Sequence, residues 1–175
     1  MKIQKILLRD ETKYDAAVIT EVTVAAFESM EISNHTEQFI IEALRSAGAL
    51  TLSLVAEVDG CVVGHIAFSP VVISDGTDHW YGLVPVSVLS MYQRMGIGKA
   101  LIQEGLSRLK DLGANGCCLV GHPQYYRKFG FGNVAGLFHE GIPQEVFFAL
   151  SFDGRFPQGN VTFHEGFKAN GQERQ

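Results

Sequence analysis

The sequence is short of positive charge, and this shortage argues against a nucleic-acid-binding protein. Lys and Arg together number 14 against 19 Asp and Glu, and no dense run of Lys and Arg interrupts that balance. Binding to nucleic acid depends on a basic face that displaces counterions from phosphates. We therefore expect no nucleic-acid partner, whereas a weakly acidic surface is compatible with a cationic or amine substrate.

Cysteine is also scarce. The three cysteines are Cys61, Cys117 and Cys118, and their spacing matches neither a zinc site nor a disulfide framework. We expect no metal. The sequence predicts instead that all three are buried, small apolar side chains in a reducing compartment.

Long apolar runs are absent. No run approaches the roughly 20 residues that a membrane span needs, and the N-terminal segment reaches charged residues too soon for the apolar core of a signal peptide. These absences predict a soluble, cytoplasmic protein that does not associate with a membrane.

What the sequence does contain is enough apolar surface for a core. Apolar side chains make up 46% of its 175 residues, which suits one globular domain. We expect a single domain over residues 1–175, with a core over about residues 3–152 and a C-terminal extension over 153–175.

Hydrophobic spacing predicts two helices near the N-terminus, after an opening strand over residues 2–10. The first helix lies within residues 12–30, with Thr12 and Asp15 as its cap and an apolar stripe of Val18, Val22, Ala25 and Ala26. The second lies within 36–48 and ends at Gly48.

β-rich segments follow. Two of them, 50–58 and 61–74, meet at Asp59-Gly60, a dipeptide typical of tight hairpin turns. A strand over 80–90 carries Pro85, which cannot donate to a sheet ladder, so we expect the sheet to open there. The remaining segments are predicted as a helix over 97–113, a strand over 115–121, a short helix over 123–130 and a strand over 145–152. This order predicts one mixed α/β domain with a central, largely antiparallel sheet.

Residues 86–102 form a strand, a loop and the start of a helix, with Gly96 and Gly98 in the loop. The first backbone N–H groups of a helix have no acceptor within it, and the helix dipole adds about half a positive charge there. Two glycines would let a diphosphate approach those groups, and Gln93 and Arg94 add donors at the rim.

Two other glycine motifs fit poorly. A Walker loop needs a glycine where Gln93 stands and a Ser or Thr where Ala100 stands. A dinucleotide fingerprint needs a third glycine at the position of Leu101. Spacing alone leaves a purely structural role open, in which the two glycines only form a tight turn.

The stretch "QRMGIG" resembles the acyl-coenzyme A signature of the GNAT N-acetyltransferase superfamily, and "YYRKFGF" (125–131) is similar to its second hallmark. The segment "GHPQYYRKFGF" (121–131) looks most like a bacterial subgroup called YhbS-like. The resemblance extends from about residue 6 to 152. It implies an acyltransferase fold whose central sheet is splayed between the fourth and fifth strands. Many relatives carry an asparagine before the tyrosine, and this shorter segment lacks it.

The resemblance implies acetyl-CoA as cosubstrate. Its diphosphate would lie on the backbone N–H groups of Gln93, Arg94, Met95, Gly96, Ile97, Gly98 and Lys99. The pantetheine arm would pair with backbone groups of Val86 and Val88, where the strand opens after Pro85.

Catalysis by direct attack of an amine needs a base for the amine and an acid for the departing thiolate. By the resemblance, Tyr126 is the acid, although simple packing is the alternative. We expect Tyr125 to point elsewhere, because adjacent helical residues do not share a face. His122 is the candidate base, although it is also a natural cap position before Pro123. Two further ionisable side chains are more typical of structural positions: Glu57 and His65.

The function implied is transfer of acetyl from acetyl-CoA to the primary amine of a small molecule or peptide, by a monomer or homodimer. A non-catalytic acyl-CoA-binding sensor is the alternative. Residues 27–44 and 131–148 are expected to line the acceptor pocket, with four carboxylates available to attract a cation: Glu28, Glu31, Glu140 and Glu145.

Overall fold

The computed structural model describes residues 5–31 and 33–171. Its centre is a six-stranded sheet in the order β1-β2-β3-β5-β6-β8, in which every neighbouring pair is antiparallel except β5 and β6. The strands are β1 Ile6–Asp10, β2 Leu52–Val58, β3 Cys61–Pro70, β5 Trp80–Val88, β6 Gly116–Val120 and β8 Phe147–Ser151. The predicted mixed, largely antiparallel sheet is confirmed, and residues 2–4 of the predicted first strand lie outside the described residues.

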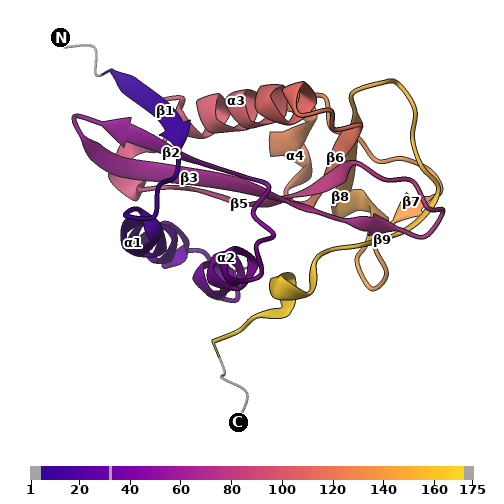
Figure 1. The fold of residues 1–175 in the computed structure, drawn as a ribbon, viewed down its shortest axis with the longest axis horizontal. Helices are drawn as coiled ribbons and strands as arrows, with labels where there is room; N and C mark the ends of the chain where they lie inside the picture. The colour runs from indigo at the N-terminus through magenta and orange to yellow at the C-terminus, as the bar shows by residue number, and fades with distance from the viewer. Residues whose placement is uncertain (1–4, 32, 172–175) are drawn as a thin grey trace.

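Helices cover both faces of this sheet. Figure 1 shows α1 (Ala16–Phe27) and α2 (Glu37–Ser46) on one face and α3 (Ile97–Asp111) and α4 (Pro123–Tyr126) on the other. Short 3-10 helices are η1 Ser90–Tyr92, η2 Arg127–Phe129, η3 Gln144–Val146 and η4 Glu165–Lys168. Each face of the sheet therefore has its own buried apolar cluster, the larger one under α3.

The hairpin between β2 and β3 turns at Asp59 and Gly60, as predicted. Their φ angles are +51° and +80°, and two consecutive positive φ angles are typical of the type I′ turn that suits twisted strands. Cys61 follows this turn directly, at the turn end of the hairpin. The prediction that Cys61 is buried is wrong, because its position leaves it exposed, whereas Cys117 and Cys118 are fully buried.

Strand β5 opens at Pro85, as predicted. Between the pairs His65 with Ser87 and Ala67 with Val84, β5 carries two residues opposite one on β3, which is a β-bulge. On its other side β5 pairs with β6 only as far as Gly82. The end of β5 is thus without a strand neighbour on the side of β6, and this confirms the splayed sheet.

Helix α1 buries a stripe that shares Val22 and Ala26 with the predicted one. Ile19, Val22, Thr23 and Ala26 are buried, whereas Val18 is only partly buried. Thr23 can lie inside because its hydroxyl donates a hydrogen bond of 2.7 Å to the Ile19 carbonyl. A polar residue therefore lies on the buried face of α1, which the spacing of apolar residues did not predict.

The predicted cap of α1 is also different in detail. Asp15 is the N-cap residue, but its carboxylate accepts from the Thr12 N–H at 2.6 Å and from the Thr12 hydroxyl, and no side chain caps the helix. The pair stabilises the loop before the helix instead. Asp15 is then held from the sheet by Arg9, at 2.7 Å.

A second, smaller sheet forms at one end of the molecule and was not predicted. It consists of β4 (Val72–Ile73), β9 (Gly159–Thr162) and β7 (Leu137–Phe138). Strand β9 lies in the predicted C-terminal extension, of which the last four residues are outside the described part. After β9 the chain crosses to the α1 and α2 face, where η4 packs against α2.

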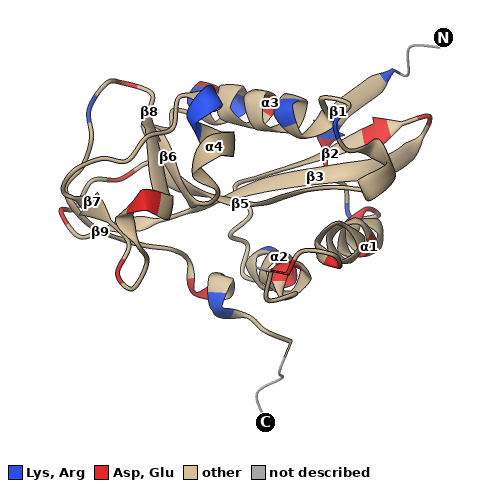
Figure 2. Cartoon of the chain, turned by 180° about the vertical axis from the view of Figure 1, so that it is seen from behind, with Lys and Arg blue, Asp and Glu red and all other residues tan. Residues whose placement is uncertain are grey.

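Charged residues are interspersed over the ribbon in Figure 2, with Lys and Arg on α3 and beside α4. Among the helices that the structure describes, none has the length and apolar character needed to cross a membrane.

Candidate active site

A cleft of about 1430 Å³ lies where β5 and β6 part. Its first wall consists of the end of β5, the start of α3, the end of β6 and helix α4. Its second wall is lined by residues from the segments 139–142 and 160–168. The end of α1 and the turn after it close one side with Ala26, Phe27 and Met30. The cleft therefore joins the two helix-covered faces of the sheet through its splayed edge.

The start of α3 presents free backbone donors to this cleft. Gly96 is the N-cap, in a left-handed conformation with φ +85°, and no side chain caps the helix. A β-carbon on Gly96 would have no neighbour within 4 Å, so the space above it is open. Gly98 and Lys99 line the cleft, whereas the Ile97 side chain is buried in the core. This is the arrangement that accepts an anion at a helix start.

Positive side chains lie beside these donors. Arg94 and Lys99 line the cleft, and Lys128 Nζ lies 4.2 Å from the ring centroid of Tyr125. Met95 is half exposed and does not line the cleft. Gln93 is partly engaged, since its backbone N–H donates to the Ser90 carbonyl at 3.3 Å and its side-chain amide to the Val88 carbonyl at 3.0 Å.

Val86 and Val88 line the cleft from the opened part of β5, together with Pro85. Across the gap lie Val120 and Gly121 at the end of β6. Because β5 has no strand neighbour here on the side of β6, an extended ligand would find backbone groups at this edge.

Two tyrosines of α4 line the cleft. Their rings meet edge to face with centroids 5.0 Å apart, and neither hydroxyl has a hydrogen-bond partner among the described residues. The prediction that Tyr125 points elsewhere is wrong, because both tyrosines line the cleft. Tyr126 packs over Gly121, where a β-carbon would meet its ring at 2.4 Å.

Burial raises the pKa of Tyr126 well above its usual range, with smaller contributions from Tyr125 and Cys117. Burial alone raises the pKa of Tyr125. Both phenols therefore stay protonated at neutral pH, which is the state that a proton donor requires.

His122 lies on the cleft at the start of α4. Its Nδ1 accepts a hydrogen bond of 3.3 Å from the Gln124 backbone N–H. The side chain therefore caps the helix, which was the alternative to a catalytic role in the sequence analysis. In the neutral ring the proton is then on Nε2.

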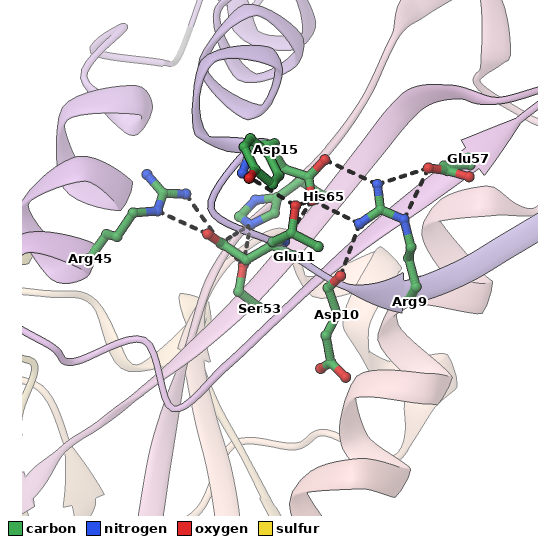
Figure 3. A network of polar contacts seen from close by, with 10 residues as sticks. Arg9, Asp10, Glu11, Asp15, Arg45, Ser53, Glu57 and His65 are labelled. Carbon is green, nitrogen blue, oxygen red and sulfur yellow. Dashed lines mark hydrogen bonds and ion pairs between the residues drawn. The ribbon is translucent and has the colours of Figure 1, made fainter.

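Glu57 and His65 lie away from the cleft, in the polar network of Figure 3. Arg9 binds Glu57 at 2.8 Å. His65 is fully buried, with Nε2 2.8 Å from the Ser53 hydroxyl, which in turn donates to Glu11. Both candidates are therefore structural, as the sequence favoured.

The second wall contains side chains that the motifs did not single out. His139, Phe163 and Phe167 line the cleft, with the His139 and Phe163 rings edge to face at 4.9 Å. Of the four glutamates expected near an acceptor, only Glu140 lines the cleft. The sequence feature that could have indicated these side chains is the frequent occurrence of Phe and His after residue 138.

No group of three or more His, Cys, Asp or Glu within residues 5–31 and 33–171 could hold a metal ion. The three cysteines are free thiols, and burial raises the pKa of Cys117 and Cys118.

Comparison of the sequence with known proteins identifies a family that it matches. Residues 17–131 match the model of the acetyltransferase (GNAT) family. The uncharacterized N-acetyltransferase YhbS of Escherichia coli K12 is 36% identical over 127 residues, which are 72% of this chain and 73% of that protein.

Solved structures of acetyltransferases are similar to this fold. A GNAT family acetyltransferase from Brucella melitensis in complex with acetyl-CoA is 49% identical, covers 93% of this chain and 98% of its own, and has a TM-score of 0.83. YhbS from Escherichia coli in complex with CoA is 32% identical, with 95% and 94% covered and a TM-score of 0.86.

Proposed function

The chain belongs to the GNAT acetyltransferase family and is an acetyl-CoA-dependent acetyltransferase of the YhbS-like kind, and we propose that it acetylates a primary amine by direct attack. The observation that carries the proposal is the cleft at the parting of β5 and β6, where free helix-start donors and an unpaired strand edge adjoin two protonated tyrosines. These are the parts that binding and deacylating a thioester require.

The diphosphate of acetyl-CoA lies, in this proposal, on the backbone N–H groups of residues 93–99. The left-handed Gly96 and the small Gly98 leave room for the phosphates, and Arg94, Lys99 and Lys128 add positive charge. Two relatives solved with acetyl-CoA or CoA support this use of the cleft.

The pantetheine arm pairs with the opened edge of β5, at the backbone of Val86 and Val88. The end of the β5–β6 ladder at Gly82 supports this, because it leaves this edge of β5 without a strand neighbour. The thioester would then lie between β5 and α4, close to both tyrosine rings.

Tyr126 acts as the acid that protonates the departing thiolate. Its hydroxyl has no partner among the described residues, and burial keeps it protonated. Tyr125 belongs to the same wall, and its hydroxyl lies close to Gly98. Of the three histidines that line the cleft, His122 and His139 are the candidates for the base, and the third is His164.

The experiment that tests the function combines binding and turnover in one preparation. Isothermal titration measures acetyl-CoA binding, and a free-thiol assay measures CoA release with amines added singly. Binding with amine-dependent thiol release is the expected result. Binding without release from any amine contradicts the proposed transfer and favours a non-catalytic acyl-CoA-binding protein.

A further inference from the structure

The second wall of the cleft, residues 139–142 and 160–168, lies outside the stretch that matches the family model, which ends at residue 131. It faces the strand edge and helix start that serve the cosubstrate. The composition of this wall therefore bears on what the acceptor is.

This wall combines apolar and aromatic side chains with polar ones and carries little negative charge. Phe163, Phe167 and Ile142 line it, and Phe27 approaches from α1. Glu140 is the one carboxylate among the described lining residues, and Lys168 lies on the same wall. A polyamine or aminoglycoside carries several cationic groups and needs several carboxylates, whereas one ammonium on an apolar body matches one carboxylate beside aromatic rings.

The hydrogen bonds of three cleft histidines fix different tautomers. Nδ1 of His122 accepts from the Gln124 N–H, and Nδ1 of His164 accepts from the Gly166 N–H at 2.9 Å. In the neutral ring each therefore carries its proton on Nε2 and has its lone pair already occupied. Neither ring has a free site for a proton in these positions.

His139 is the opposite case. Its Nδ1 lies 2.7 Å from the Val161 carbonyl oxygen, which can only accept, so Nδ1 carries the proton. Nε2 then holds a free lone pair, and it has no hydrogen-bond partner among the described residues. Edge-to-face packing on Phe163 fixes the ring plane. This is the tautomer that a proton-accepting histidine needs, with the Nε2 lone pair free.

We propose that the second wall is the acceptor site, that it takes a primary monoamine on an apolar or aromatic body, and that His139 Nε2 accepts the proton of its ammonium group. The proposal rests on the proposed acetyl transfer and names its substrate class and base.

The proton balance is complete with the groups named. The ammonium gives one proton to His139 Nε2, which returns it to solvent, and the freed lone pair forms the C–N bond to the thioester carbonyl. The C–S bond breaks with its electron pair on sulfur, and the thiolate takes a proton from Tyr126. The new amide nitrogen releases its second proton through solvent to the phenolate. One proton is released for each acetyl group transferred.

The test uses the full-length protein with acetyl-CoA and the probes phenethylamine, putrescine and spermidine. The expected result is a kcat/KM for phenethylamine at least about tenfold above that of either polyamine, since one matched or unmatched charge is worth about that factor. A higher value for spermidine overturns the substrate class.

The base is tested with His139→Asn, in which the amide N–H can still donate to the Val161 carbonyl but no proton can be accepted. With phenethylamine we expect kcat to fall about 100-fold, with unchanged acetyl-CoA affinity. The matched control is His79→Asn, at an exposed position outside the cleft with a positive φ that Asn tolerates, and it should behave as wild type.

A second amine separates base chemistry from structural damage. The ammonium form of 2,2-difluoro-2-phenylethylamine is far more acidic, so much of it is already neutral at neutral pH, and the defect of His139→Asn should shrink at least about tenfold. An equal defect with both amines, or a loss in His122→Asn that follows this pattern instead, overturns the role of His139. Turnover of putrescine or spermidine without turnover of phenethylamine overturns the acceptor site and leaves the proposed transfer standing. Acetyl-CoA binding without turnover of any amine overturns the proposed transfer itself, and absence of acetyl-CoA binding overturns the cosubstrate site as well.

Discussion

The hydroxyl of Tyr125 lies 3.2 Å from the point where a β-carbon on Gly98 would stand. Helix α4 therefore reaches over the first turn of α3, although the two are far apart in the sequence. Lys128 follows on the same wall, with Nζ over the Tyr125 ring. An aromatic hydroxyl and a cation thus lie over the start of α3, and both can bind a phosphate there.

Gly98→Val should weaken acetyl-CoA binding at least about tenfold, or about 1.4 kcal/mol. The added side chain meets the Tyr125 hydroxyl and fills the approach of the diphosphate. Gly98 has no positive φ, so backbone strain is not expected to contribute. Isothermal titration measures the effect, with Gly132→Val as control because a β-carbon there meets nothing within 4 Å. Equal affinity in wild type and Gly98→Val would remove the diphosphate from this helix start.

Tyr126→Phe should lower kcat about 100-fold, the scale typical of losing an acid, with little change in acetyl-CoA affinity. The ring packing over Gly121 is kept, so the loss reports on the hydroxyl. Tyr125→Phe should have the smaller effect on kcat and the larger one on acetyl-CoA binding, and the exposed Tyr14→Phe should change neither. Steady-state kinetics across pH decides: wild-type turnover of Tyr126→Phe at every pH would exclude it as the acid.

Gly105→Ala should destabilise the protein by about 1–3 kcal/mol. A β-carbon there would stand 2.5 Å from a ring carbon of Phe68, which is fully buried and has no room to move. This overpacking outweighs the gain of about 1 kcal/mol in helix propensity. Urea unfolding measures it, against Ser107→Ala on the exposed face of the same helix. A stabilised Gly105→Ala would show that α3 can shift away from the sheet.

Stability should fall with acid between about pH 6.5 and 4 because of His65. Burial lowers its pKa from 6.5 to about 4, against the opposing charge of Glu11, with Arg45 adding to the shift. In that window the unfolded chain binds a proton that the folded protein does not, so acid favours unfolding. The full effect approaches about 3 kcal/mol, at about 1.4 kcal/mol for each unit.

The carboxylates of the same network act at lower pH. The pKa of Glu11 is lowered because its hydrogen bonds with Arg45 and Ser53 outweigh burial, and that of Asp15 lies far below its usual value, chiefly through Arg9. The contributions of these two carboxylates to the stability of the folded protein are lost only as pH falls below about 4.5. His65→Gln should therefore flatten the stability curve between pH 6.5 and 4 alone, as urea unfolding at a series of pH values would show. An unchanged slope in that window would mean that His65 is not the titrating group.

Local patterns predicted much of the fold, because each depends on near neighbours in the sequence. The Asp59-Gly60 turn and the proline in β5 are backbone effects that act within a few residues. The exposure of Cys61 was missed since apolar character does not say that a residue stands at the end of a hairpin. The burial of Thr23 was missed because its hydroxyl is satisfied within its own helix.

The cleft was predictable only on its first wall, where the glycines and tyrosines lie in short motifs. The second wall depends on the pairing of β9 with β4 and β7, strands of two to four residues that are too short to show a period. The role of His139 depends further on one hydrogen bond to a carbonyl of β9. Contacts between such distant segments leave no local pattern in a single sequence.

The most direct test of the account is a crystal structure of the protein with acetyl-CoA. We predict diphosphate oxygens about 2.7–3.2 Å from backbone nitrogens of residues 93–99, with the pantetheine arm along β5 at Val86 and Val88. Acetyl-CoA bound elsewhere, with the start of α3 left free, would contradict it.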